Sequence, residues 1–223
     1  MKLATVLATA SLIATGFGAT AASATTVYSD RATFESQLAG HFTDDYENPG
    51  YTFFQSDAQM SSVVGQTTYQ TTGFSNLDIV SNSGGDDYYC GGCNGSFQLD
   101  FSNTSYSTGG GVYGVGFDLV INETYNAQVT FTNGSTALFT LPLSQSFGSE
   151  AFWGVTSDLG ITSIYLGDSG QATTDGNTGI DNLEIGAGPI PEPATWAMML
   201  LGFGALGRAL RHGRRARVLQ AAV

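Results

Sequence analysis

The sequence predicts an all-β fold: a jelly-roll-like β-sandwich that begins with one short N-terminal helix. Its composition supports this class, because 42% of the residues are apolar, only 12% are charged and 30 are glycine, which is typical of a β-rich globular protein. Short apolar runs recur about every 8–12 residues between clusters of Gly, Asn, Asp and Ser. Several runs alternate; in residues 97–101, Phe, Leu and Phe share one face while Gln and Asp share the other. Such alternation predicts sheets with one buried and one solvated face.

The predicted elements start with the helix and continue as strands. Ser29-Asp30 can cap a helix over Arg31–Leu38, whose apolar residues fall on one face. The Asn133-Gly134 pair lies between two apolar runs and predicts a hairpin turn, because both residues tolerate positive φ. Strands are expected near Asp44–Glu47, Tyr51–Phe54, Met60–Val64, Thr67–Thr71, Leu77–Val80, Ser96–Phe101, Val112–Ile121, Ala127–Thr132, Ala137–Leu141, Ala151–Thr156, Ile161–Leu166 and Gly179–Ile185.

The first 24 residues have the pattern of a secretory signal peptide. Lys2 supplies a short positive region, and Leu3–Phe17 supplies an apolar one. Ala22 and Ala24 then fit the small-x-small pattern that precedes a cleavage site. We therefore expect Thr25 to be the first residue of the exported protein, and the β-sandwich ectodomain to occupy residues 25–186.

The C-terminal region has three parts in a fixed order. A Gly/Pro linker over residues 187–193 ends in Pro191-Glu192-Pro193, an apolar run over residues 194–207 follows, and five arginines lie from Arg208 to Arg217. The run is shorter than the roughly 20 residues of a full membrane span. With Ile190 before it and Ala209-Leu210 after it, the segment can cross a bilayer only if Arg208 snorkels. Arginines after a span are held on the cytoplasmic side. The order predicts a C-terminal membrane helix over residues 194–210 and a basic cytoplasmic tail over residues 211–223.

This ending, PEPATWAMMLLGFGALG followed by arginines, closely resembles the PEP-CTERM sorting signal of Gram-negative bacteria. The resemblance implies that Pro191, Glu192 and Pro193 form the motif near which an exosortase cuts. It also implies a protein that is exported, transiently anchored in the inner membrane, and then released to the cell surface or the extracellular matrix. The alternative is a plain C-terminal anchor that is never cut.

The central region resembles the globular domains often found on PEP-CTERM proteins. The resemblance rests on Phe152-Trp-Gly-Val-Thr-Ser, Gly160-Ile-Thr-Ser-Ile and Gly179-Ile-Asp-Asn-Leu, with Asp44-Asp-Tyr-Glu47 similar to their first core strand. It implies a jelly-roll β-sandwich and no particular activity. Jelly-roll carbohydrate-binding modules similar in outline often hold calcium between the first core strand and the last. By that resemblance, Glu47 and Asp181 would be the calcium ligands.

The charge of the domain restricts its partners. Between Thr25 and Gly188 the chain has eighteen acidic residues and one base, Arg31. Such a surface repels nucleic acid and anionic lipid, and it favours divalent cations. We therefore expect no nucleic-acid partner. No motif requires a cofactor, and calcium is the ion that the carboxylates of the loop at residues 167–179 and of the last strand would suit.

Several residues leave alternatives open. Cys90 and Cys93 have three alternatives: a structural disulfide, two free thiols, or a metal or redox pair. Export of the protein favours the disulfide. The aromatic residues either form a platform for sugar rings or pack in the core; they are Tyr51, Phe53, Phe54, Tyr88 and Tyr89. His41 is the one histidine before the tail, so a hydrolase would depend on it. A glycosidase would instead need a carboxylate pair from Asp44, Asp45 and Glu47.

Three functions follow, in order of preference. The first is an exported, non-enzymatic surface or matrix protein, whose partners are exosortase and the inner membrane during sorting and then extracellular polysaccharide. The second is a calcium-dependent carbohydrate-binding module of the same fold. The third is a secreted glycoside hydrolase.

Overall fold

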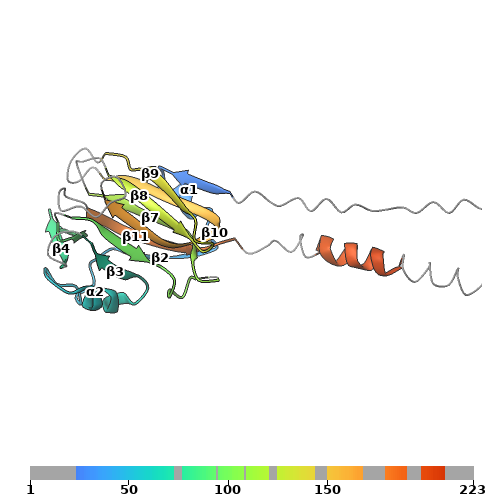
Figure 1. Cartoon of the computed structure of the whole chain (residues 1–223), viewed down its shortest axis with the longest axis horizontal. Helices are drawn as coiled ribbons and strands as arrows, with labels where there is room; N and C mark the ends of the chain where they lie inside the picture. The colour runs from blue at the N-terminus through green and yellow to red at the C-terminus, as the bar shows by residue number, and fades with distance from the viewer. Residues whose placement is uncertain are drawn as a thin grey trace, which may run out of the picture.

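The computed structural model describes residues 24–72, 77–93, 95–107, 109–120, 125–143, 150–167, 179–189 and 197–208 (Figure 1). The first seven ranges form a domain of eleven strands and two helices. In chain order these are β1 (Thr25–Tyr28), α1 (Arg31–Glu35), β2 (Gly40–Asp44), α2 (Asp57–Val64), β3 (Thr68–Thr71), β4 (Asp78–Ser83), β5 (Asp86–Gly91), β6 (Phe97–Asp100), β7 (Val112–Leu119), β8 (Asn126–Phe131), β9 (Thr136–Thr140), β10 (Ala151–Gly167) and β11 (Gly179–Ala187).

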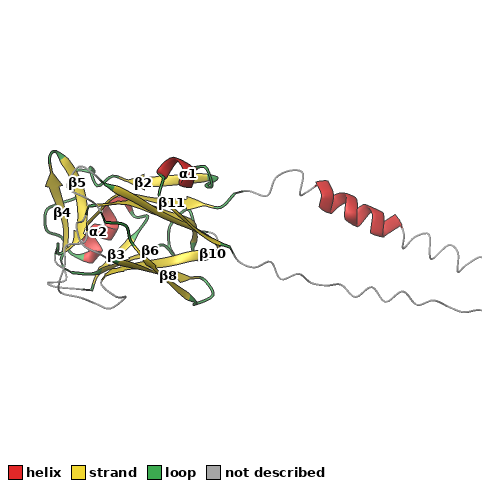
Figure 2. Cartoon of the chain, turned by 90° about the horizontal axis from the view of Figure 1, so that it is seen from above, coloured by secondary structure: helices red, strands yellow, loops and turns green. Residues whose placement is uncertain are grey.

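The domain is a β-sandwich whose two layers share the long strand β10 (Figure 2). The first half of β10 pairs with β1 and β7, and β7 continues through β11 to β2, β5 and β4. The second half of β10 pairs with β6 and β8, which continue to β3 and β9. All these pairings are antiparallel. The all-β class and the sandwich predicted from the alternating pattern are confirmed.

Strand β10 replaces two predicted strands. Residues 151–156 and 161–166 are continuous within one strand, and the glycine between them, Gly160, has a φ of +73°. Gly111 lies against the same region, where an added Cβ would meet the carbonyl oxygen of Ile161 at 2.8 Å. Gly160 within β10 and the neighbouring Gly111 therefore let the strand leave one layer and enter the other.

The buried core lies between the two layers. Alternate residues of β7 and β10, such as Val115, Phe117, Trp153 and Val155, point inward and are at most 3% exposed. Strands β6 and β8 alternate buried and half-buried residues along their whole lengths, as their sequences predict.

Helix α1 covers the outer face of the first layer. It begins after Asp30, whose side chain accepts a hydrogen bond from the Thr33 amide, and its one buried residue is Phe34. An added Cβ at Gly114, Gly116 or Gly154 would come within 3.0–3.1 Å of the Phe34 ring. The missing side chains of three glycines thus make room for the ring. The predicted helix is confirmed, although it ends at Glu35.

The strand predicted near Met60–Val64 is wrong, because these residues belong to helix α2. Ser56 and Gln59 form a reciprocal capping box, and Gly65 ends the helix in the left-handed conformation. Met60, Val63 and Val64 have the i, i+3, i+4 spacing of a helix face, which the strand interpretation overlooked.

Two further strand predictions also fail in the same region. The strand placed near Asp44–Glu47 ends at Asp44 instead, and the positive φ of Tyr46 (58°) turns the chain away. Residues 51–54 form no strand. In exchange, β1 and β5 form where the sequence interpretation placed no strand.

Candidate functional site

Arg31 joins helix α1 to the outer face of the first layer. Its guanidinium donates hydrogen bonds to Glu184 Oε2 at 2.6 Å, Asp118 Oδ2 at 3.0 Å and the carbonyl oxygen of Asn182 at 3.1 Å. It also lies over the ring of Phe152, 4.7 Å from the centroid. Arg31, the one arginine or lysine between residues 25 and 188, therefore connects α1 to β7, β10 and β11.

One group of carboxylates at this face could hold a hard cation. Asp86, Glu150 and Asp181 each offer an oxygen, and the three oxygens lie within 4.8 Å of one another. Asp181 is 2% exposed, and burial raises its pKa to about 7. Burial, together with the carboxylates of Asp118 and Asp86, also raises the pKa of Glu150. Oxygen ligands of this kind suit calcium.

A second group combines carboxylates with an imidazole. Glu35 on α1, His41 on β2 and Glu184 on β11 offer ligand atoms that also lie within 4.8 Å of one another. Glu184 is fully buried, and burial raises its pKa against the opposing influence of His41 and Arg31. His41 Nδ1 lies 3.5 Å from Glu184 Oε1.

The two predicted calcium ligands lie in different surroundings. Asp181 belongs to the group with Asp86 and Glu150, whereas Glu47 does not. The exposed Glu47 Oε1 accepts a hydrogen bond from the Asp87 amide at 2.8 Å, next to Asp86 in β5. Sequence reasoning missed Glu150, because no local pattern links it to the last strand. The other candidate acids of the loop, at positions 168 and 175, lie outside the described residues.

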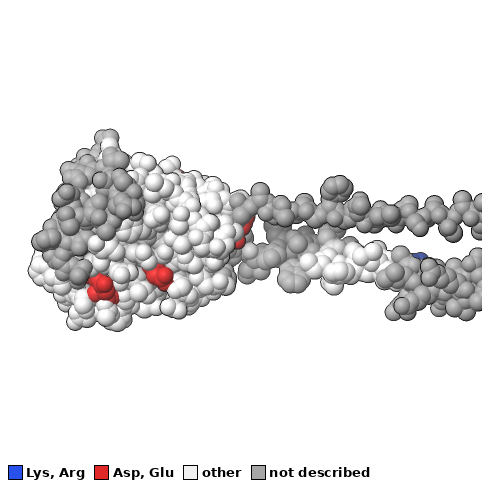
Figure 3. All heavy atoms as spheres, viewed as in Figure 1, with Lys and Arg blue, Asp and Glu red and all other residues white. Residues whose placement is uncertain are grey.

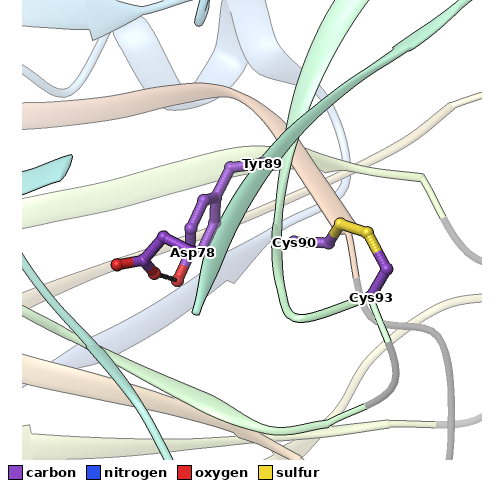
Figure 4. Close-up of a disulfide and its surroundings, with 4 residues drawn as sticks. All are labelled: Asp78, Tyr89, Cys90 and Cys93. Atoms are coloured by element: carbon purple, nitrogen blue, oxygen red, sulfur yellow. Dashed lines mark hydrogen bonds between the residues drawn. A yellow bond between two sulfur atoms is a disulfide. The ribbon is translucent and has the colours of Figure 1, made fainter. Parts of the chain in front are cut away.

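Two buried aspartates accept hydrogen bonds from a cluster of buried tyrosines. Asp44 Oδ2 accepts hydrogen bonds from the hydroxyls of Tyr51 and Tyr69, and burial raises the Asp44 pKa. Asp78 Oδ1 accepts one from Tyr89 at 2.6 Å (Figure 4). Both carboxylates therefore lie inside the domain and are bound to core tyrosines.

The aromatic residues named as a sugar platform divide between two roles. Tyr51 and Tyr89 belong to the core. Phe53 and Phe54 are 56% and 58% exposed and meet edge to face, with centroids 4.5 Å apart. They do not present one flat surface, because the two rings are inclined by 79°.

The residues that a hydrolase would need do not share one site. His41 and Asp44 lie three residues apart on β2, so they point to opposite faces of the sheet. Asp44 is buried among tyrosines, and the exposed Glu47 contacts the Asp87 amide. His41, Asp44 and Glu47, which the hydrolase hypothesis requires in one cleft, therefore lie in different surroundings.

Cys90 and Cys93 form a disulfide at the end of β5 (Figure 4). Gly92 and Cys93 both have positive φ, 72° and 52°, which lets the chain turn within the four residues. Of the three alternatives for this pair, the structure shows the disulfide.

The processing residues at the two ends fall partly outside the described ranges. The Ala24 carbonyl oxygen accepts a hydrogen bond from the Asp158 amide at 3.2 Å, the Ala24 amide donates one to Asp158 Oδ2 at 3.4 Å, and Thr25 begins β1. Ala22, Pro191, Glu192 and Pro193 lie outside the described residues. In the tail, residues 197–208 are helical and exposed. No helix in the described part of the chain has both the length and the apolar character needed to cross a membrane.

The face of the domain shown in Figure 3 has few charged groups. Acidic side chains appear at separate places, and most of the described surface between them is uncharged.

Comparison with solved structures finds similarity to two carbohydrate binding modules. One is a native family 35 carbohydrate binding module from Clostridium thermocellum, 14% identical, with a TM-score of 0.35, covering 60% of this chain and 96% of that chain. The other is a mutant of a family 29 carbohydrate binding module, 14% identical, with a TM-score of 0.38, covering 69% of this chain and 97% of that one. At this identity neither likeness indicates a ligand for this chain.

Among curated proteins no significant match is found. The C-terminal segment, in contrast, matches a family directly. Residues 189–215 match the PEP-CTERM protein-sorting motif, so the chain carries at its C-terminus the sorting signal that its Pro-Glu-Pro tripeptide, apolar run and arginines predict.

Proposed function

We propose that this chain is an exported, non-enzymatic bacterial protein that an exosortase sorts to the cell surface or the extracellular matrix. The observation that carries the proposal is the PEP-CTERM motif at residues 189–215, directly after a folded domain that ends at Ala187. In this proposal the leader is removed after Ala24, and the acidic domain folds outside the inner membrane.

The arrangement of the chain ends supports this order of events. The start of β1 and the end of β11 leave the domain at the same end (Figures 1 and 2). The leader and the tail would therefore reach the membrane from one side of the domain, and neither would have to pass around it.

The tail itself supplies the physical basis for sorting. Arg208 and the arginines after it oppose transfer, because each costs about 2.5–3.5 kcal/mol at the membrane centre on the translocon scale. Pro191 and Pro193 disfavour a continuous helix into the linker and favour an extended chain, which a protease can bind. The exosortase would then cut near these prolines and release the domain among extracellular polysaccharides.

The test is replacement of Pro191, Glu192 and Pro193 by alanine in a Gram-negative host that has an exosortase. We expect the wild-type chain to lose its tail, and the variant to stay at full length in the inner membrane. Intact mass spectrometry of the medium and membrane fractions reports both products. Equal release of the alanine variant, or equal release from a host without exosortase, would contradict the proposal.

A second candidate is a calcium-dependent carbohydrate-binding module. The specific observation in its favour is the group of Asp86, Glu150 and Asp181, which offers only oxygen ligands. A glycan array probed with the purified protein in calcium and in chelator tests it. Binding in calcium alone would support this candidate, and no binding under either condition would remove it.

A further inference from the structure

The group of Glu35, His41 and Glu184, which we call the imidazole site, joins three elements that are far apart in the sequence. Glu35 is the last residue of α1, His41 is the second residue of β2, and Glu184 lies within β11. His41 pairs with Gly186 across the sheet, so it lies diagonally next to Glu184 on the same face. Helix α1 packs over that face and brings Glu35 to it.

The spacing of the imidazole and the buried carboxylate matches that of two metal ligands. His41 Nδ1 and Glu184 Oε1 lie 3.5 Å apart. A charge-assisted hydrogen bond would be shorter, about 2.7–2.9 Å. Two ligand atoms on a tetrahedral Zn²⁺, each about 2.0–2.2 Å from the metal, lie roughly 3.3–3.6 Å apart. The separation of the pair is therefore one that two ligands of a single ion can have.

Glu184 Oε1 also lacks the partner that a buried oxygen requires. The Glu184 side chain is 0% exposed, and Oε2 accepts a short hydrogen bond from Arg31, but Oε1 accepts none from the described residues. An unsatisfied buried carboxylate oxygen is costly. A cation between Glu184, His41 and Glu35 would satisfy it.

The local charge favours a divalent ion. Glu35, Glu184 and Asp118 bring three carboxylates to this region, and Arg31 contributes one positive charge. With a neutral imidazole these groups sum to an excess of two negative charges, which one divalent cation would balance. His41 has a side-chain exposure of 40% and Glu35 is half-buried, so an ion can enter from solvent and reach Glu184 below them.

The ligand types distinguish this site from the group of Asp86, Glu150 and Asp181. An imidazole nitrogen with carboxylate oxygens suits zinc and neighbouring transition metals, whereas calcium takes oxygen ligands. We propose that Glu35, His41 and Glu184 form a binding site for a divalent transition metal ion, with Zn²⁺ as the reference ion. The bound ion ties α1 to β2 and β11, and water completes its coordination.

Calorimetric titration of the full-length chain with ZnCl₂ tests this site. The protein is purified in detergent and first stripped of metal with a chelator. We expect one zinc ion to bind per chain and the Tm of the domain to rise, since an ion that binds only the folded state stabilises it. His41→Ala and Glu35→Gln should each weaken binding by more than about tenfold, the lower limit for loss of a group that merely supports a ligand.

His212→Ala is the matched control, because His212 is the other histidine of the chain and lies in the basic tail. This variant should bind zinc as the wild type does. Both site variants change partly exposed side chains, and near-UV circular dichroism confirms that they are folded. The site is disproved if the wild type binds no zinc, if His41→Ala binds it unchanged, if binding depends on His212, or if equimolar calcium displaces the zinc.

Discussion

At the residue scale, the acid with the most unusual surroundings is Asp78. Its side chain is fully buried, Tyr89 donates to one oxygen, and the other oxygen accepts no hydrogen bond from the described residues. Burial raises the Asp78 pKa to about 7, the Tyr89 hydroxyl opposes that rise, and the nearby Asp57 carboxylate adds to it. The neutral acid form therefore suits this buried position.

This pKa predicts that the domain loses stability as the pH rises. In the unfolded chain an aspartate has a pKa of about 3.9. The stabilisation from a raised folded pKa is therefore complete below pH ~4 and is lost as the pH rises through about 7. Urea unfolding should show a larger free energy of unfolding at pH 5 than at pH 8, by up to roughly 1.4 kcal/mol for each pH unit between 5 and the folded pKa.

Asp78→Asn should remove its share of this dependence, because the amide stays neutral. At pH 8 this variant should match or exceed the wild type in stability. Asp181 shifts in the same direction, so part of the slope should remain. A wild type whose stability is the same at both pH values would contradict the assignment.

At the element scale, helix α1 packs on a part of the sheet where glycines leave room for aromatic rings. Gly116 on β7 lies under two rings, where an added Cβ would come within 2.7 Å of Phe152 and 3.0 Å of Phe34. Phe34 is fully buried, and Arg31 holds the same helix by its hydrogen bonds to β7 and β11. Neither ring can move without disturbing these contacts.

Gly116→Ala should therefore destabilise the domain by about 1–3 kcal/mol, the usual range for an overpacked site. Chemical denaturation at one pH measures this loss. Gly40→Ala is the matched control, because Gly40 has no atom within 4 Å of an added Cβ and its φ is not positive. If both variants are equally stable, the packing of α1 against this face is looser than the contacts indicate.

At the scale of the whole molecule, the folded domain and the sorting tail are consecutive in the chain. The domain ends at Ala187 and the motif match begins at residue 189. The strands that begin and end the domain, β1 and β11, are each paired within the first layer. The first and last strands of the domain therefore both find their partners within the domain.

Deletion of residues 194–223 should give a folded domain that leaves the inner membrane without exosortase. The variant keeps the leader, and it lacks the apolar run and arginines that would stop transfer. Cell fractionation and intact mass should find it outside the inner membrane, beginning at Thr25. Retention of this truncated chain in the membrane would show that another segment anchors the protein.

Local patterns account for the features that could be predicted. The alternation in β6 and β8 determines which residues are buried, the Asp30 cap starts α1, and the order of tripeptide, apolar run and arginines identifies the tail. Helix α2 was also visible in its capping box and apolar spacing, but the surrounding β-rich sequence favoured a strand. These signals span only a few residues each.

By itself the sequence determined the all-β class and the sorting motif, because period-two alternation and a contiguous tail are both local properties of the chain. Only the tertiary structure decided which charged groups meet. Arg31 and Glu184 are 153 positions apart, and Glu35, His41 and Glu184 come together through the pairing of β2 with β11 and the packing of α1. Strand register determines which side chains lie next to each other, and register follows from the packing of the whole sandwich.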